Sequence, residues 1–224
     1  MPEKGNKVQF NLKNVHYAIL KESEEDGAIS WDTPVHVPGA VTLALDPEGE
    51  MTPFYADGIA YYRSVANNGY SGDLEMAKYP DRMLQDVWGY TLTETENVIV
   101  ENSNVEPKSF ALLFQIDGDI DNEFYCMYNA MGTRPGIGST TNTDTKEPQT
   151  QSSTITASPL EDGRVMAKTT ATTTPEVKTN WFKKVYEPAA SLLASASNVD
   201  TQQETQQSLQ QNTMKQNVTT QSAK

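Results

Sequence analysis

The sequence predicts a mainly β protein, either a β-sandwich or an open barrel of two packed sheets, with one short flanking α-helix. Three observations support this fold class. Apolar and polar residues alternate in many short stretches of residues 6–187, and turn residues separate those stretches. Threonine, which favours extended backbone, is dense in the later stretches. One stretch has the apolar spacing of a helix that lies on a sheet.

The first strands are expected before residue 78. Turn residues at 24–27 and 38–39 interrupt the alternation. Residues 67–69, which read Asn-Asn-Gly, are a further turn signal because Asn and Gly tolerate positive φ, and we expect them to join two strands in a hairpin. The strands expected here cover residues 8–12, 15–19, 29–31, 35–37, 41–45, 61–66 and 70–77.

Residues 80–89 predict the helix. Pro80 suits the first helical position, the Asp81 carboxylate complements the positive end of the helix, and Gly89 is typical of a helix end. The helix is short, so it must lie on a sheet to be stable. The apolar stripe that would contact the sheet consists of Met83, Leu84, Val87 and Trp88.

The second half of the chain returns to strand-like patterns. Many short strands with a single helix favour a sandwich or a barrel over a helical or α/β fold. The strands expected here cover residues 90–94, 98–101, 110–116, 123–128, 150–157, 164–173 and 177–185.

Composition divides the chain into two parts. Residues 198–224 contain almost no apolar residue and no aromatic one, so they cannot bury enough surface to offset the entropy of ordering. We therefore expect a β domain over residues 1–188 and a flexible Gln-, Thr- and Ser-rich extension over residues 189–224.

Charge and composition exclude several functional classes. The chain has 30 acidic and 17 basic residues and a net charge of −13, which argues against affinity for nucleic-acid phosphates. The single Cys126 excludes a disulfide framework and a cysteine-based zinc site. No apolar run is long enough to span a membrane, and the N-terminus lacks the apolar stretch of a secretory signal. We expect a soluble acidic protein that is made inside the cell.

No motif predicts catalysis, a cofactor or a metal ion. His16 and His36 lie in strand-like stretches, where a structural or surface role is expected. Residues 117–121 resemble the start of a calcium loop, but the positions that need Gly and Glu hold Asn122 and Tyr128, so we expect a hairpin turn. Acidic pairs of the kind that hydrolyse glycosides arise by chance among so many acids, and none lies in a stretch that would raise its pKa. We therefore expect no enzyme.

Residues 46–61 mix acidic and large apolar residues in an expected loop between two strands. Polar loops normally lack such apolar content, so these side chains need a surface that buries them. That surface is either the rest of the same chain or a neighbouring copy. A second irregular stretch, residues 132–147, is rich in Gly, Thr and Asn, and we expect it to be mobile or ordered by assembly.

Several long stretches carry a resemblance to a known protein family. They read NKVQFNLKNVHYAIL, PVHVPGAVTLALDPEGEMTPFYADGIAYY, NNGYSGDLEMAKYPDRMLQDVWGY, SFALLFQIDGD, FYCMYNAMGTRP and STITASPLEDGRVMAKT, and together they cover most of residues 6–187. None is a short generic motif. On these stretches the chain resembles the major tail proteins, or tail-tube proteins, of long non-contractile-tailed phages of low-GC Gram-positive bacteria.

The resemblance implies a structural virion protein without catalytic activity. In similar tube proteins, two packed sheets flanked by a helix form the subunit, six copies close into a ring, and rings stack into the tube through which DNA leaves the virion. It implies a place in the phage tail after synthesis in the host bacterial cytoplasm. The expected partners are other copies of the chain, a tape-measure protein, and tail-terminator and distal-tail proteins. DNA would pass through without specific binding, and no membrane would be involved.

Two sets of candidate residues follow from the resemblance. In related tube proteins a long loop between early strands reaches the adjacent ring, and residues 46–61 match its position. The candidates for this inter-ring loop are Asp46, Glu48, Glu50, Met51, Phe54, Tyr55 and Ile59. We also expect acids to line the lumen, because a negative wall repels DNA phosphates. The candidates for the lumen are Asp57, Asp73, Glu75, Asp117, Asp119 and Asp121.

Other functions stay open. A tail terminator or a distal-tail ring protein would form one ring and would not stack. A soluble ligand- or carbohydrate-binding β-sandwich, favoured by 10 tyrosines and 3 tryptophans, would be a monomer with a concave aromatic site. The extension after residue 188 falls outside the matching stretches, and it is a surface decoration, an arm that contacts a ring, or a dispensable tail.

Overall fold

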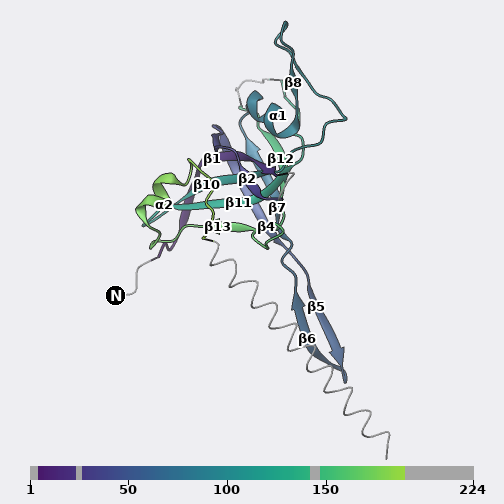
Figure 1. Ribbon diagram of the computed structural model, residues 1–224, viewed down its shortest axis with the longest axis vertical. Helices are drawn as coiled ribbons and strands as arrows, with labels where there is room; N and C mark the ends of the chain where they lie inside the picture. The colour runs from purple at the N-terminus through teal and green to yellow at the C-terminus, as the bar shows by residue number, and fades with distance from the viewer. Residues whose placement is uncertain (1–4, 24–26, 142–146, 190–224) are drawn as a thin grey trace, which may run out of the picture. The chain divides into compact units, whose positions relative to one another are not determined.

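The computed structural model describes residues 5–23, 27–141 and 147–189 (Figure 1), and this part of the chain is mainly β, as the sequence predicts. Its strands are β1 (Gln9–Glu22), β2 (Ile29–Trp31), β3 (Val35–His36), β4 (Ala40–Glu48), β5 (Met51–Ala56), β6 (Ile59–Val65), β7 (Gly69–Met76), β8 (Thr91–Leu92), β9 (Ile99–Val100), β10 (Phe110–Gly118), β11 (Glu123–Gly132), β12 (Gln151–Ala157) and β13 (Met166–Lys168). Its helices are α1 (Asp81–Trp88) and α2 (Pro175–Asn180).

Two expectations fall largely outside these residues. The chain divides into a unit of Met1–Tyr186, which contains all the elements above, and a unit of Glu187–Lys224. The expected flexible extension, residues 189–224, is described only at its first residue and stays a prediction. Residues 133–141 belong to no helix or strand, while residues 142–146 are not described. The expected mobility of residues 132–147 therefore also stays a prediction.

Nine of the described strands form one antiparallel sheet. Its order is β2-β1-β10-β11-β12-β7-β4, with β3 paired to β1 and β13 paired to β11. Strand β11 joins the two parts of the sheet, because residues 125–127 pair with β13 and residues 130–132 pair with β12. Side chains from β1 and β4, near opposite ends of this order, contribute to the same hydrophobic core. The sheet therefore folds over one core, which is consistent with a sandwich-like class, although hydrogen bonds join the two expected sheets into one.

Strand β10 is buried on both faces. Five consecutive residues, 110–114, are at most 4% exposed. Phe110 and Leu112 point into the core that β4 and β7 share, whereas Ala111 and Leu113 point into a second core on the opposite face. A strand covered on both sides needs apolar residues at every position, so it reads as a continuous apolar run.

Helix α1 covers one end of the first core. Met83, Val87 and Trp88 are buried in it, and Leu84 packs beside them, so the predicted apolar stripe is confirmed. The Trp88 indole donates to the Gly132 carbonyl at 2.9 Å. The sequence placed Pro80 at the first helical position, but it is the N-cap, with extended φ and ψ of −63° and 140°.

The second core is closed by a segment that the sequence assigned wrongly. Residues 177–185 were expected to form a strand, yet the chain forms α2 and then turns, so a second helix is present. Pro175 starts this helix, and Val177, Trp181 and Val185 follow one another at four-residue spacing on the side that packs against the core. A spacing of four also fits the two-residue alternation of a strand, so periodicity alone does not separate a helix from a strand here. Pro175 favours the helix, because proline suits the first helical position.

Residues 66–68 separate β6 from β7, as the turn signal indicates, but the hairpin predicted there is wrong. Strand β6 pairs with β5, and β7 pairs with β4 and β12, so β6 and β7 do not form a hairpin. The tight turn lies instead at Asp57 and Gly58, whose φ angles are +52° and +77°. An Asp-Gly pair at these φ values suits the two-residue turns that join antiparallel strands. Residues 46–61 are therefore mostly strand and not a loop.

Gly89 ends α1 in the left-handed region, with φ of +67°, and a Cβ there would lie 2.3 Å from Cγ1 of Val105. Gly163 has a similar φ of +83° but no atom within 4 Å of such a Cβ. We expect Gly163→Ala to lower the free energy of unfolding by about 1–2 kcal/mol through conformation alone, and Gly89→Ala to lower it further. Urea unfolding of both variants measures the difference. An equal decrease in the free energy of unfolding of both variants would show that the Val105 side chain moves aside without an energetic cost.

Candidate functional site

The β5–β6 hairpin is the most exposed apolar element of the described chain. It continues from β4 and β7 through backbone hydrogen bonds, from Asn68 N–H to the Glu48 carbonyl at 2.9 Å and from Ala66 N–H to the Glu50 carbonyl at 3.1 Å. Between 55% and 69% of each large apolar residue on it is exposed. These residues are Met51, Phe54, Tyr55, Ile59, Tyr61, Tyr62 and Val65.

The structure brings together only part of the predicted inter-ring set. Met51, Phe54, Tyr55 and Ile59 lie on the hairpin, and Glu50 lies directly before it. Sequence reasoning missed Tyr61, Tyr62 and Val65, which lie on β6 opposite the predicted residues. The Asp-Gly pair at 57–58 would have indicated them. A two-residue turn there joins two strands in a hairpin, so the residues of β6 lie beside those of β5.

Asp46 and Glu48 belong to β4 rather than to the hairpin. The register of β4, β7 and β12 places Asp46 on the same side of the sheet as Asp73 and Glu75 of β7. We name this side the acidic face, and define it by the side chains that alternate with the core residues of the three strands. Its members are Thr42, Ala44, Asp46, Glu48, Ser71, Asp73, Glu75, Ser152, Thr154 and Thr156.

Hydroxyl groups and carboxylates dominate the acidic face. Thr154 Oγ1 donates to Asp73 at 2.8 Å, and Thr150 Oγ1 donates to Glu75. None of the ten residues is a lysine or an arginine, so none of them offsets the four carboxylates of Asp46, Glu48, Asp73 and Glu75. The result is a negatively charged sheet surface, and none of its ten members is a large apolar residue. Two predicted lumen acids, Asp73 and Glu75, lie on it.

The other predicted lumen acids lie elsewhere. Asp57 is in the turn of the hairpin, and the remaining three are in or next to the connection between β10 and β11. Asp117 forms an ion pair with Lys13 at 2.6 Å, and this contact lowers the pKa of its carboxyl below the usual value. Asp119 accepts a hydrogen bond from the backbone N–H of Lys7 at 2.9 Å. The structure therefore does not gather the six acids on one surface.

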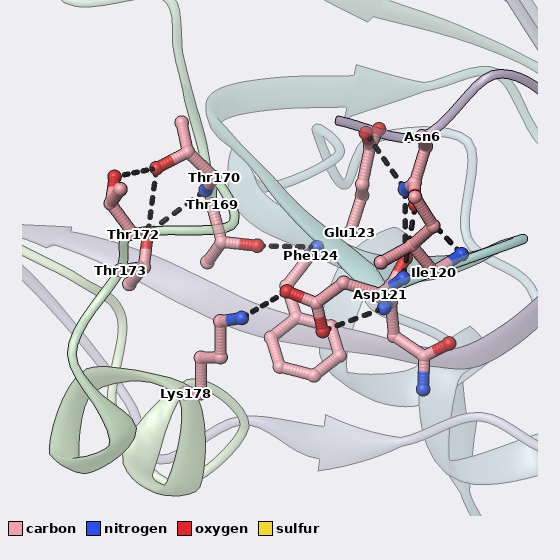
Figure 2. A network of polar contacts seen from close by, with 11 residues as sticks. Asn6, Ile120, Asp121, Glu123, Phe124, Thr169, Thr170, Thr172, Thr173 and Lys178 are labelled. Atoms are coloured by element: carbon pink, nitrogen blue, oxygen red, sulfur yellow. Dashed lines mark hydrogen bonds and ion pairs between the residues drawn. The ribbon is translucent and has the colours of Figure 1, made fainter. Parts of the chain in front are cut away.

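Asp121 belongs to a network that ties three segments together (Figure 2). The Asn6 side chain accepts hydrogen bonds from the N–H groups of Ile120 and Asp121, at 3.1 and 2.9 Å, and donates to the Asp121 carbonyl at 2.7 Å. The Asp121 carboxylate pairs with Lys178 of α2. These contacts hold the turn against the N-terminal segment and α2. The paired strands on either side confirm that residues 117–121 lead into a hairpin turn.

The histidines and the cysteine have structural surroundings. His16 on β1 faces His36 on β3 with ring centroids 4.9 Å apart, and its ring stacks on Phe182 at 4.7 Å. Burial lowers the pKa of His16. Cys126 is fully buried in the second core, and desolvation raises the pKa of its thiol to about 12. Such a thiol is protonated at neutral pH and is a poor nucleophile.

An open groove of about 380 Å³ lies over the first core. Its lining includes Phe10, Leu45, Tyr70, Phe114 and Tyr125, so it is apolar and partly aromatic. Within the described part of the chain, no three or more His, Cys, Asp or Glu side chains are grouped to hold a metal ion. None of the helices in the described ranges is long and apolar enough to cross a membrane.

Comparison with protein-family models finds no match to this chain, and comparison with curated proteins finds none either. Function must therefore be inferred from the sequence and from the surfaces described above.

Partial burial of His16 makes stability depend on pH. Because its folded pKa lies below the ordinary value of 6.5, the unfolded chain binds more protons as the pH falls below 6.5. We expect the free energy of unfolding to decrease from pH 6.5 down to the folded pKa, at pH values above those at which carboxylates titrate. Urea unfolding at pH 7.5, 6.5 and 5.5 tests this. His16→Gln should flatten the dependence, and an equal slope in both proteins would contradict the assignment.

Proposed function

We propose that this chain is the major subunit of a phage tail tube, a structural virion protein that forms stacked rings around a channel for DNA. The observation that carries the proposal is the β5–β6 hairpin and its seven exposed large apolar side chains. Water disfavours such a surface, so contact with another copy that buries it would be favourable. This fits the loop that reaches an adjacent ring in the family that the sequence resembles.

Strand β4 supports closure of a ring. It lies at the end of the main sheet and pairs with β7, and no other described strand pairs with it. The backbone groups along its outer edge are therefore available to a strand of another copy. An edge on one side of a subunit that meets a different surface of its neighbour makes a head-to-tail contact, and such contacts form a ring when the rotation from one copy to the next closes.

The acidic face supports the channel. Its carboxylates repel DNA phosphates, and its small hydroxyl side chains offer neither cations nor apolar patches to which DNA could adhere. The four acids of this face, Asp46, Glu48, Asp73 and Glu75, are thus the ones best suited to the lumen. The tape-measure, tail-terminator and distal-tail proteins expected from the resemblance, and the location in the virion, belong to the same proposal.

The apolar groove favours a second candidate function. Its volume of about 380 Å³ falls in the range of small-molecule sites, and aromatic side chains line part of it. A ligand-binding β-sandwich would use this groove as a monomer, and it would have no need for the exposed hairpin. A terminator or distal-tail ring would use the β4 edge but would not stack.

Negative-stain electron microscopy of the purified chain at rising concentration separates these functions. We expect hollow tubes of uniform width with a regular axial repeat. Single rings that never stack would favour a terminator or distal-tail protein. Monomers at every concentration, including after addition of preassembled tail tips as nuclei, would contradict a tube subunit.

The acidic face can be tested by charge reversal. We expect tubes that carry Asp46→Lys, Asp73→Lys and Glu75→Lys to retain at least about tenfold more double-stranded DNA at low salt than the original tubes, and to release it as salt rises. The matched control carries Glu94→Lys, Glu96→Lys and Glu161→Lys, which make the same charge change at exposed positions elsewhere. Filter retention of labelled DNA measures both. Equal retention by the control would contradict this choice of lumen residues.

A further inference from the structure

The β5–β6 hairpin is apolar on both of its faces. We propose that the hairpin of one copy inserts between two other copies, so that each face is buried by a different subunit. This inference rests on the tube-subunit function proposed above and adds to it the number of chains that one hairpin contacts.

The strand register assigns the side chains to faces. Met51 pairs with Val65, and Phe54 pairs with Tyr62. Side chains alternate along a strand, so positions 51 and 54 on β5 point to opposite sides. We name the side of Met51, Tyr55 and Val65 the first face and the side of Phe54 and Tyr62 the second face.

Both faces are open to solvent in a single chain. The exposed fractions of Met51 and Val65 on the first face are 59% and 69%, and those of Phe54 and Tyr62 on the second are 62% and 55%. A hairpin that lay on its own subunit or on one neighbour would bury one face and leave the other in water. A partner surface on each side of the hairpin would remove both faces from water.

The area is large enough for a specific contact. Four aromatic side chains on the hairpin, each more than half exposed, contribute about 500 Å², and the three aliphatic ones bring the total to the order of 800 Å². Each partner of a standard protein interface contributes a similar area, about 800 Å². Divided between two faces, it gives two contacts that are each weak and together specific.

Charges are sparse on the hairpin strands. Arg63, which pairs with Pro53 on the first face, is the only charged residue of β5 and β6, and Asp57 lies in the turn. The second face has no charged residue, with Thr52 and Ser64 as its polar positions. A second copy of this chain offers a matching apolar surface, the groove that Phe10, Leu45 and Tyr70 help to line. We assign this groove to one of the two faces.

Paired substitutions test the two faces separately. Met51→Ser with Val65→Ser alters the first face, and Phe54→Ser with Tyr62→Ser alters the second. We expect each pair to raise the critical concentration for tube formation at least about tenfold, while circular dichroism and urea unfolding stay unchanged because these side chains are exposed in the monomer. The matched control, Val98→Ser with Ile137→Ser, removes exposed apolar residues elsewhere and should leave the critical concentration unchanged.

Cross-linking counts the chains around one hairpin. Cys126 is buried, so a benzophenone maleimide would label only an introduced thiol. In tubes that contain a small fraction of Tyr55→Cys, Tyr62→Cys double variant, illumination should produce three-chain adducts, and each single variant should produce only two-chain adducts.

Two outcomes overturn this inference alone. One is an unchanged critical concentration when the residues of one face are substituted, and the other is the absence of a three-chain adduct in tubes with the double-labelled variant. If the unsubstituted chain forms no tubes, with or without tail-tip nuclei, the proposed function fails and this inference fails with it.

Discussion

Burial of β10 on both faces is the constraint on which the rest of the fold depends. Residues 110–114 leave no polar position, so both sides of the strand must be covered. One side receives α1 and the strands that curl around the first core, and the other receives α2 with Trp181 and Val185. The network around Asn6 and Asp121 then fastens the end of β10 to both the N-terminal segment and α2. These polar contacts are therefore secondary to the need of one apolar strand to be buried on both sides.

Local patterns in the sequence predicted the elements whose neighbours are local. Alternation located most strands, and Gly89 with the apolar stripe located α1. Residues 177–185 were misassigned because four-residue spacing satisfies a helix and a strand alike. The partners of β6 and β7 were misassigned because two turn signals, at 57–58 and 67–69, competed, and only the three-dimensional register shows which one closes a hairpin.

The candidate surfaces were predicted less completely than the fold. The exposed apolar residues between 51 and 59 were recognisable because a loop has no reason to carry them. The acidic face was not recognisable in the sequence, because its residues come from three strands. Asp46 lies on the same side as Asp73 only because β4 pairs with β7. Acids such as Asp117 and Asp121 look alike in a sequence, but Lys13 and Lys178 neutralise them in the fold.

The pairing of β1 with β10 has a consequence for how the chain folds during synthesis. Gln9 is opposite Gly118, and residues 9–13 pair only with β10, so this end of the longest described strand has no partner until the ribosome has added about a hundred further residues. At about 5–20 residues per second, that interval lasts roughly 5–20 s. Contacts between such distant residues also slow the folding step itself. A nascent chain therefore exposes this end of β1 and the apolar hairpin at the same time, and synthesis of many copies side by side favours aggregation before the sheet is complete.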